Sequence, residues 1–249
     1  MSDWPDGALT EDRLLDGRVT LSQPRQGLRA GLDAVLLAAS IPAKPGQTVI
    51  EAGCGAGAVF LCLLARVPGL KVVAVEREPR LAALARANAE ANGHAGQVQV
   101  ILGDIADAAV RTLLPRADHA FANPPWWPDG TVPPEAIKAG ATHLGGNDLA
   151  AWAKALTLPL AHRGSLTMVL PAALWPMGSA ALAEAGCGAQ AMLPLWPRVG
   201  QPARRALIQG RREAKGPARL LPGLVLHEGE GWSAEADAVL RGRAEIGWG

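Results

Sequence analysis

The strongest constraint on the fold is a repeated pattern: a short apolar segment ends beside a polar residue, and a helical segment follows. Predicted strands cover residues 47–52, 71–76, 98–104, 118–122 and 165–170, and helical segments are predicted over 58–66, 79–92 and 152–160. Strands and helices that alternate at this spacing predict an α/β fold with a parallel, doubly wound sheet and helices on both faces. In such a sheet, functional residues gather at the carboxyl ends of the strands.

Four of the predicted strands end in groups that could serve one site. These groups are Glu51 with Gly53, then Glu76, Asp104 and Asn123. A single acid at the end of a strand is usually just exposed to solvent. Four correctly spaced groups at one edge of a sheet favour a shared binding site instead.

The first of these strands runs into a glycine-rich loop, Gly53-Cys54-Gly55-Ala56-Gly57, and then into a helix. This loop fits the dinucleotide pattern G-x-G-x-x-(G/A), which is weak evidence by itself. Two features favour S-adenosylmethionine over a nicotinamide cofactor. Glu51 suits the cationic amino group of a methionine moiety and would repel a pyrophosphate, and a third glycine stands at Gly57.

The other strand ends have matching roles in this interpretation. We expect Glu76 to accept hydrogen bonds from both ribose hydroxyls, Asp104 to accept from the adenine amine, and Ile105 to flank the adenine ring. Together with Glu51 and the three glycines, these residues form the predicted cofactor site.

The tetrapeptide Asn123-Pro124-Pro125-Trp126 follows the fourth strand and predicts transfer of a methyl group to a planar nitrogen. The lone pair of such a nitrogen is delocalised, so the nitrogen is a poor nucleophile. The Asn123 side-chain oxygen and the Pro124 carbonyl can accept both N–H hydrogens and favour the pyramidal, nucleophilic form. The prolines fix φ and remove donors, and Trp126 offers a flat face for a base. The competing interpretation is a proline-rich turn with packed tryptophans.

Composition limits the partners, the metal sites and the cellular compartment that we expect for this chain. The chain has 249 residues, 24 basic and 23 acidic, so any nucleic-acid contact requires a local patch. Such a patch is predicted from five arginines, although solvated arginines on an edge strand are an equal alternative: Arg198, Arg204, Arg205, Arg211 and Arg212. Three cysteines without C-x-x-C spacing predict a reducing compartment and no metal site. No signal peptide or membrane-spanning segment is recognised, so we expect a cytoplasmic protein.

The chain is predicted to form one domain in three parts. Residues 1–46 are an N-terminal arm and a cofactor-covering segment with Asp33 as a helix N-cap, 47–171 are the core, and 189–249 carry an antiparallel hairpin and a tail. Residues 190–195 and 205–209 form that hairpin. We expect Trp152, Trp175 and Trp196 to pack in the core or at its edge, and we assign no role to His143 in the long segment 126–146.

These motifs resemble the class I S-adenosylmethionine-dependent methyltransferases, and within them the bacterial adenine-N6 methyltransferases of a valine tRNA. Further similarity lies in residues 17–19, 23–38, 202–205 and 226–228. The resemblance implies a seven-stranded sheet with an antiparallel last strand. It also implies that Arg29 and Asp33 close over the cofactor and that Asn123 and Trp126 hold the target adenine. Trp126 departs from the usual Tyr or Phe of that family.

The sequence therefore predicts an RNA adenine-N6 methyltransferase that acts on tRNA or another structured RNA without a metal. Three alternatives stay open in descending order: a protein-glutamine methyltransferase, an RNA-binding protein that retains the cofactor pocket without turnover, and a nicotinamide oxidoreductase. The target nucleotide and the oligomeric state are not predicted.

Overall fold

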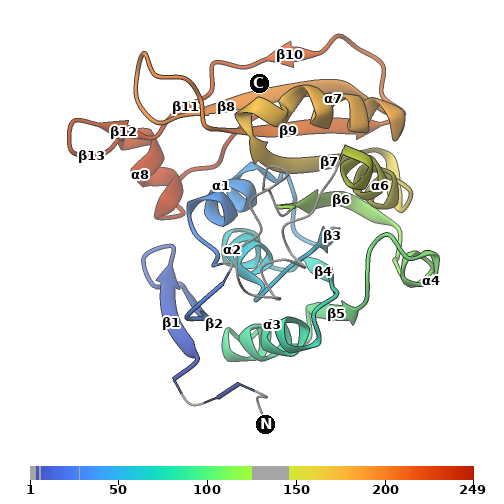
Figure 1. Cartoon of the computed structure of the whole chain (residues 1–249), viewed down its shortest axis with the longest axis vertical. Helices are drawn as coiled ribbons and strands as arrows, with labels where there is room; N and C mark the ends of the chain where they lie inside the picture. The colour runs from blue at the N-terminus through green and yellow to red at the C-terminus, as the bar shows by residue number, and fades with distance from the viewer. Residues whose placement is uncertain (1–3, 6, 28, 125–145) are drawn as a thin grey trace.

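The computed structural model describes residues 4–5, 7–27, 29–124 and 146–249. Its central sheet runs through the middle of the molecule (Figure 1). Its strand order is β10-β8-β9-β7-β6-β3-β4-β5, with β11 also paired to β8. Strands β3 to β7 are parallel to one another, whereas β9 is antiparallel to both of its neighbours, β7 and β8. This confirms the predicted α/β class and the antiparallel last long strand. The described sheet has nine strands and not the seven implied, because the two-residue strands β10 and β11 pair with β8.

The predicted core elements form where the sequence places them. The strands are β3 (Thr48–Ala52), β4 (Lys71–Glu76), β5 (Val98–Leu102) and β6 (Ala117–Ala122), and the helices are α2 (Ala58–Arg66) and α3 (Pro79–Ala91). The short α4 (Ala108–Arg111) was not predicted. The α3 helix has Pro79 in its first turn, where the missing N–H carries no penalty. Its N-cap is Glu78, whose side chain accepts from the Arg80 N–H.

The second half of the chain adds the other side of the sheet. It contains α6 (Gly146–Thr157), β7 (Leu160–Pro171), the short helix η1 (Ala172–Leu174), α7 (Trp175–Glu184), β8 (Cys187–Trp196) and β9 (Arg205–Arg212). The predicted hairpin is β8–β9, but its strand β9 lies inside the sheet, next to β7. The two-residue strands β10 (Arg219–Leu220) and β11 (Leu224–Val225) cover the outer side of β8.

The N-terminal part is more ordered than predicted. Residues expected to be a loose arm form β1 (Leu9–Leu14), which pairs with β2 (Val19–Pro24) as an antiparallel ribbon. Side-chain contacts far apart in the sequence stabilise it, because Asn88 of α3 and Asn92, the C-cap residue of α3, bond to the backbone of β2. Such contacts are invisible to a local reading of the sequence.

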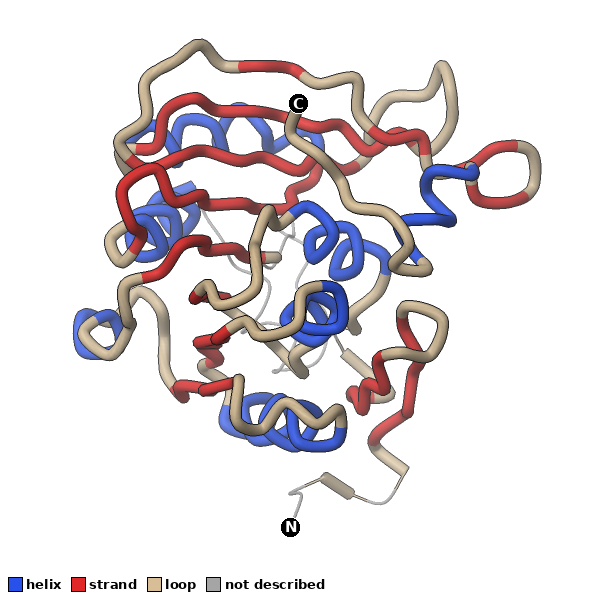
Figure 2. The backbone as a smooth tube through the Cα atoms, turned by 180° about the vertical axis from the view of Figure 1, so that it is seen from behind, coloured by secondary structure: helices blue, strands red, loops and turns tan. Residues whose placement is uncertain are grey.

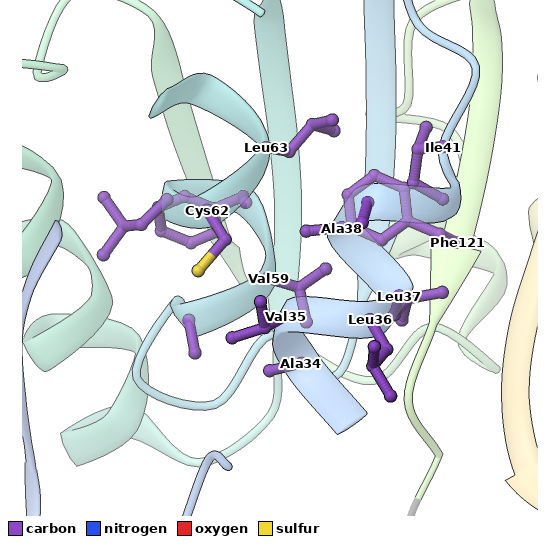
Figure 3. Packing of buried hydrophobic residues seen from close by; sticks show 14 of the residues in the cluster. Ala34, Val35, Leu36, Leu37, Ala38, Ile41, Val59, Cys62, Leu63 and Phe121 are labelled. Atoms are coloured by element: carbon purple, nitrogen blue, oxygen red, sulfur yellow. The ribbon is translucent and has the colours of Figure 1, made fainter. Parts of the chain in front are cut away.

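Helices cover both faces of the sheet, as Figure 2 shows from behind. On one face α1 (Leu32–Ser40) packs against α2, and Val35, Val59 and Phe121 belong to one continuous cluster (Figure 3). On the other face α6 and α7 lie against β6, β7 and β9. Buried apolar area on both faces is the main stabilising contribution.

The C-terminal segment forms regular secondary structure and packs against the rest of the chain. The strands β12 (His227–Glu228) and β13 (Gly231–Trp232) form a small hairpin, followed by α8 (Ala234–Leu240). Beyond α8, Trp248 is buried and its Nε1–H donates to the Ser40 carbonyl at 2.7 Å. Among the residues that the structure describes, no helix is long and apolar enough to cross a membrane.

Candidate active site

The carboxyl ends of β3 and β6 bring the glycine loop next to Asn123. The two strands pair in register, with Ala52 opposite Ala122. Gly53 and Asn123 are therefore the first residues beyond two neighbouring strands, about 5 Å apart across the sheet. The predicted cofactor loop and the predicted methyl-transfer residue share one edge of the sheet.

Two positions of the loop favour glycine, each for a different structural reason. A side chain at Gly53 would place its Cβ 2.7 Å from Cη2 of Trp152, which stands on α6, and φ of Gly53 is 64°. Gly55 also has a positive φ, 55°, but a Cβ there would meet open space. Gly53 thus allows the close approach of Trp152, and Gly55 leaves the loop surface open to a ligand.

Glu51 lies beneath this loop and is 1% exposed. Its carboxylate accepts a hydrogen bond from the Phe60 N–H in α2 at 3.1 Å. Burial raises the pKa of Glu51 well above its usual value, the Phe60 bond opposes the rise, and the charge of Glu76 adds to it. A buried carboxyl of this kind is suited to a cationic partner, because a positive charge beside it favours the ionised form.

Glu76 is held at the end of β4 by two backbone donors. The Gly55 N–H donates to its Oε2 at 2.8 Å, and the Glu78 N–H donates to its Oε1 at 2.9 Å. An ionised carboxylate has about four acceptor positions. Both oxygens therefore keep capacity for the two ribose hydroxyls of the predicted cofactor, and the bond to Gly55 couples Glu76 to the glycine loop.

The two residues predicted at the adenine differ in exposure. Asp104 is exposed; its Oδ1 accepts from the Ala106 N–H at 2.8 Å, and its Oδ2 lies 4.0 Å from the guanidinium of Arg77. Ile105 is 2% exposed and belongs to the apolar cluster beneath α6. The contact between Ile105 and an adenine ring stays a prediction.

The methyl-transfer tetrapeptide is described in part. Asn123 is half-buried and Pro124 is buried, directly after the fully buried Phe121 and Ala122. Pro125 and Trp126 lie outside the described residues, as does His143. The structure therefore describes Asn123 and Pro124, whose oxygens are the predicted acceptors. The predicted contact of Trp126 with a base stays a prediction.

Arg29 and Asp33 contact protein groups near the start of α1. Arg29 donates to Asp12 at 2.7 Å, to Thr10 at 2.7 Å and to the Pro24 carbonyl at 2.9 Å. Asp33 is in the first turn of α1, but the N-cap is Gly31, so the predicted cap is wrong. The Asp33 carboxylate instead pairs with Arg205 of β9 at 3.0 Å.

The five predicted nucleic-acid arginines do not form a single patch. Because β9 is antiparallel to β7, Arg205 lies opposite Pro171 at the carboxyl edge and Arg211 opposite Ser165 at the other edge. The length of β9 between them corresponds to about 20 Å. Arg212 donates to the carbonyls of Leu158 and Leu160, which gives it a structural role. Arg205 lies at the site edge and Arg204 directly precedes it, whereas Arg198 follows β8 and donates to the Gly229 carbonyl.

The exposed fractions of the tryptophan side chains correct one of the predictions made for them. Trp196 is half-buried and its Nε1–H donates to the Pro222 carbonyl at 3.0 Å, as expected of a packed residue. Trp175 is 43% exposed and was wrongly predicted to pack. Trp152 packs against Gly53, a contact for which the sequence carries no signal. Within the described part of the chain, no group of three or more His, Cys, Asp or Glu could hold a metal ion.

Comparison with known proteins agrees with this geometry. The family model described as methyltransferase small domain matches residues 30–146. Several curated relatives are named tRNA1(Val) (adenine(37)-N6)-methyltransferase. The Porphyromonas gingivalis relative is 30% identical over 51% of this chain and 52% of its own length. The Aeromonas hydrophila relative is 29% identical over 83% and 86%. The chain spans about half the length of the first relative and 66% of another, from Actinobacillus succinogenes.

Solved structures share the fold. A predicted O-methyltransferase of Agrobacterium tumefaciens superimposes with a TM-score of 0.70 at 23% identity, covering 86% of this chain and 98% of its own. An S-adenosylmethionine-dependent O-methyltransferase of Thermotoga maritima has a TM-score of 0.55 at 18% identity, with coverage of 78% and 69%. These similarities establish the class I methyltransferase architecture.

Proposed function

We propose that this chain, whose residues 30–146 match the methyltransferase small domain model, is an S-adenosylmethionine-dependent enzyme that methylates the N6 amine of an adenine in RNA, and that this RNA is a tRNA. The relatives named as tRNA methyltransferases support the choice of RNA over protein. The chemistry of Asn123-Pro124 supports the choice of a planar amine.

One observation carries this proposal: Asn123 and the glycine loop emerge side by side from paired strands, above the buried carboxyl of Glu51. A methyl transfer requires the acceptor nitrogen and the donor carbon to be held close and in line. Neighbouring strand ends supply that proximity without any movement of the backbone. A nicotinamide enzyme would leave both Glu51 and Asn-Pro-Pro-Trp unexplained.

Each described residue has a part in this chemistry. S-adenosylmethionine, when bound, supplies a cationic sulfonium with a transferable methyl group. Glu51 balances the positive amino end, Glu76 accepts the ribose hydroxyls, and Asp104 accepts the adenine amine. The Asn123 side-chain oxygen and the Pro124 carbonyl accept the two hydrogens of the target amine. They thereby expose its lone pair, and the nitrogen loses a proton once it is methylated.

The test measures the product in cells. tRNA from a strain lacking the gene is digested to nucleosides, and N6-methyladenosine is quantified by mass spectrometry against the parent strain. We expect the nucleoside to disappear from one tRNA, to return with the wild-type gene, and to stay absent with Asn123→Ala. A matched control, Asn92→Ala, changes an asparagine that bonds β2 to α3, far along the chain from the site.

Two outcomes would contradict the proposal. Unchanged N6-methyladenosine in all tRNA fractions would exclude the tRNA assignment and direct the search to protein glutamine. Full restoration by Asn123→Ala would exclude the proposed role of that residue, whichever substrate is methylated.

A further inference from the structure

An exposed aromatic side chain stands beside the site on α7. The helix follows β7 through η1, so it begins at the carboxyl edge of the sheet, and its first residues include Trp175 and Met177, 43% and 41% exposed. β7 is the direct neighbour of β6, with Met168 opposite Ala122. Trp175 therefore presents apolar surface at the same edge as Asn123. Single exposed apolar side chains are ordinary, whereas neighbouring ones beside a site can mark a contact surface.

Arg204 lies next to this tryptophan segment. The Ala172 N–H of η1 donates to the Arg204 carbonyl at 3.1 Å, which joins the start of η1 to the residue before β9. The side chain of Arg204 is exposed, whereas its neighbour Arg205 is paired with Asp33. Trp175 and Arg204 thus lie on two segments that one backbone hydrogen bond holds together.

The elements that carry Trp175 and Arg204 contain few acids. Residues 158–183 and 185–212, which supply β7, α7, β8 and β9, contain no Asp or Glu apart from the intervening Glu184 near the far end of α7. The contrast is Trp232, which is equally exposed at 43% but stands on a hairpin that carries Glu228 and Glu230. Asp33, which also lies at this edge, is paired with Arg205. An exposed aromatic face beside an exposed arginine fits a nucleotide.

We propose that Trp175 and Arg204 form a subsite for an unpaired RNA nucleotide adjacent to the target adenine. The indole stacks on the base, and the guanidinium binds the phosphate. Two strand spacings, roughly 10 Å, separate β6 from β9 across the sheet, and Arg204 lies about three residues, roughly another 10 Å, further along the strands than Asn123. An enzyme that methylates a base must hold it out of a stack, and a second stacking surface holds its neighbour splayed. This inference rests on the proposed RNA substrate.

The experiment uses the full-length protein and unmodified tRNA from a strain lacking the gene. Trp175→Ala is expected to weaken tRNA binding about tenfold and raise KM, with kcat and S-adenosylmethionine affinity unchanged, because stacking contributes to RNA affinity alone. Trp175→Phe is expected to retain most of the affinity. Arg204→Gln is expected to weaken binding and to lower the slope of log affinity against log salt by about 1.

Matched controls separate this subsite from general effects. Trp232→Ala removes an equally exposed tryptophan, and Arg116→Gln removes an exposed arginine that precedes β6 at the opposite edge of the sheet. Both are expected to bind tRNA as the wild type does.

The outcomes distinguish the subsite from the proposed function. If the wild type methylates tRNA while Trp175→Ala and Arg204→Gln match the controls, the subsite is excluded and the function stands. If Trp175→Ala also loses S-adenosylmethionine affinity, the residue is structural and the subsite is excluded. If the wild type binds S-adenosylmethionine but neither binds nor methylates tRNA, the RNA function fails, and the subsite fails with it.

Discussion

Arg205, the first residue of β9, donates a hydrogen bond from Nε to Oδ2 of Asp33 in the first turn of α1, at 3.0 Å. The pair links two elements that are 172 residues apart in the sequence and lies at the edge of the sheet that carries the site. Asp33 is implied by the family resemblance to close over the cofactor. Its position therefore depends on an arginine that sequence alone predicted to bind nucleic acid.

This pair predicts shared effects on cofactor affinity. Asp33→Ala and Arg205→Ala should each weaken S-adenosylmethionine binding, and the double variant should be no weaker than the worse single variant. The coupling in unfolding free energy should be small, about 0.5 kcal/mol, since the side chains are 27% and 43% exposed. Calorimetry and urea unfolding of all four proteins measure both quantities. Fully additive losses of affinity would show that the two residues act separately.

Asn123→Ala should separate cofactor binding from chemistry. The side chain contacts the reacting amine in the proposed mechanism, so turnover should fall about 100-fold or more while S-adenosylmethionine affinity stays within twofold. Single-turnover assays measure the rate of methyl transfer, and calorimetry measures the affinity for S-adenosylmethionine. Lost cofactor affinity would mean that Asn123 also holds the cofactor.

Glu51→Gln should weaken S-adenosylmethionine binding, because a neutral amide cannot balance the cationic amino group. The same substitution should have the opposite effect on the unfolding free energy of the protein without cofactor. Burial raises the folded-state pKa of Glu51, so the folded protein keeps this proton at pH values where the unfolded chain has lost it. Stability from this group is therefore present at low pH and lost as pH rises through the raised pKa.

The Glu51→Gln variant should lack that loss, and its unfolding free energy at pH 8 should equal or exceed that of the wild type. Urea unfolding at pH 5 and pH 8, without cofactor, measures the difference. A variant that is less stable than the wild type at pH 8 would indicate that ionised Glu51 stabilises the fold, contrary to its burial. The exposed Glu90 provides the matched control, Glu90→Gln.

The two loop glycines should respond differently to alanine. Gly53→Ala should destabilise the protein by about 2–3 kcal/mol, since its Cβ would overlap Trp152 and its φ is 64°. Gly55→Ala should cost about 1 kcal/mol, from its positive φ alone, yet weaken S-adenosylmethionine binding more strongly relative to its effect on stability. Thermal unfolding with and without cofactor measures both. Equal stabilities of the two variants would contradict the packing of Trp152 on Gly53.

His119 should make stability fall in mild acid. It is buried in β6 between Ser165 and Gln47, and burial lowers its pKa to about 4. The unfolded chain takes up this proton near pH 6.5, before the folded protein does. Stability is therefore lost as pH falls from about 6.5 towards 4, at up to about 1.4 kcal/mol per pH unit. His119→Gln should show a shallower slope in urea unfolding between pH 7 and pH 4.5, and an unchanged slope would rule out His119 as its source.

The sequence by itself determined the alternation of β3, α2, β4, α3 and β5, because local periodicity reflects which face of each element is buried. It also determined that Glu51, Glu76 and Asn123 share one edge, because the carboxyl ends of parallel strands must meet there. It did not predict β1 or α7, whose stabilising contacts come from distant residues.

Only the tertiary structure decided how the individual side chains are used. The direction of β9 places Arg205 and Arg211 at opposite edges, so neighbours in sequence do not form one surface. Pairing with Asp33 occupies Arg205, whereas Arg204 and Trp175 remain exposed beside the site. Strand direction, ion pairing and exposure depend on long-range packing, for which a local sequence pattern carries no signal.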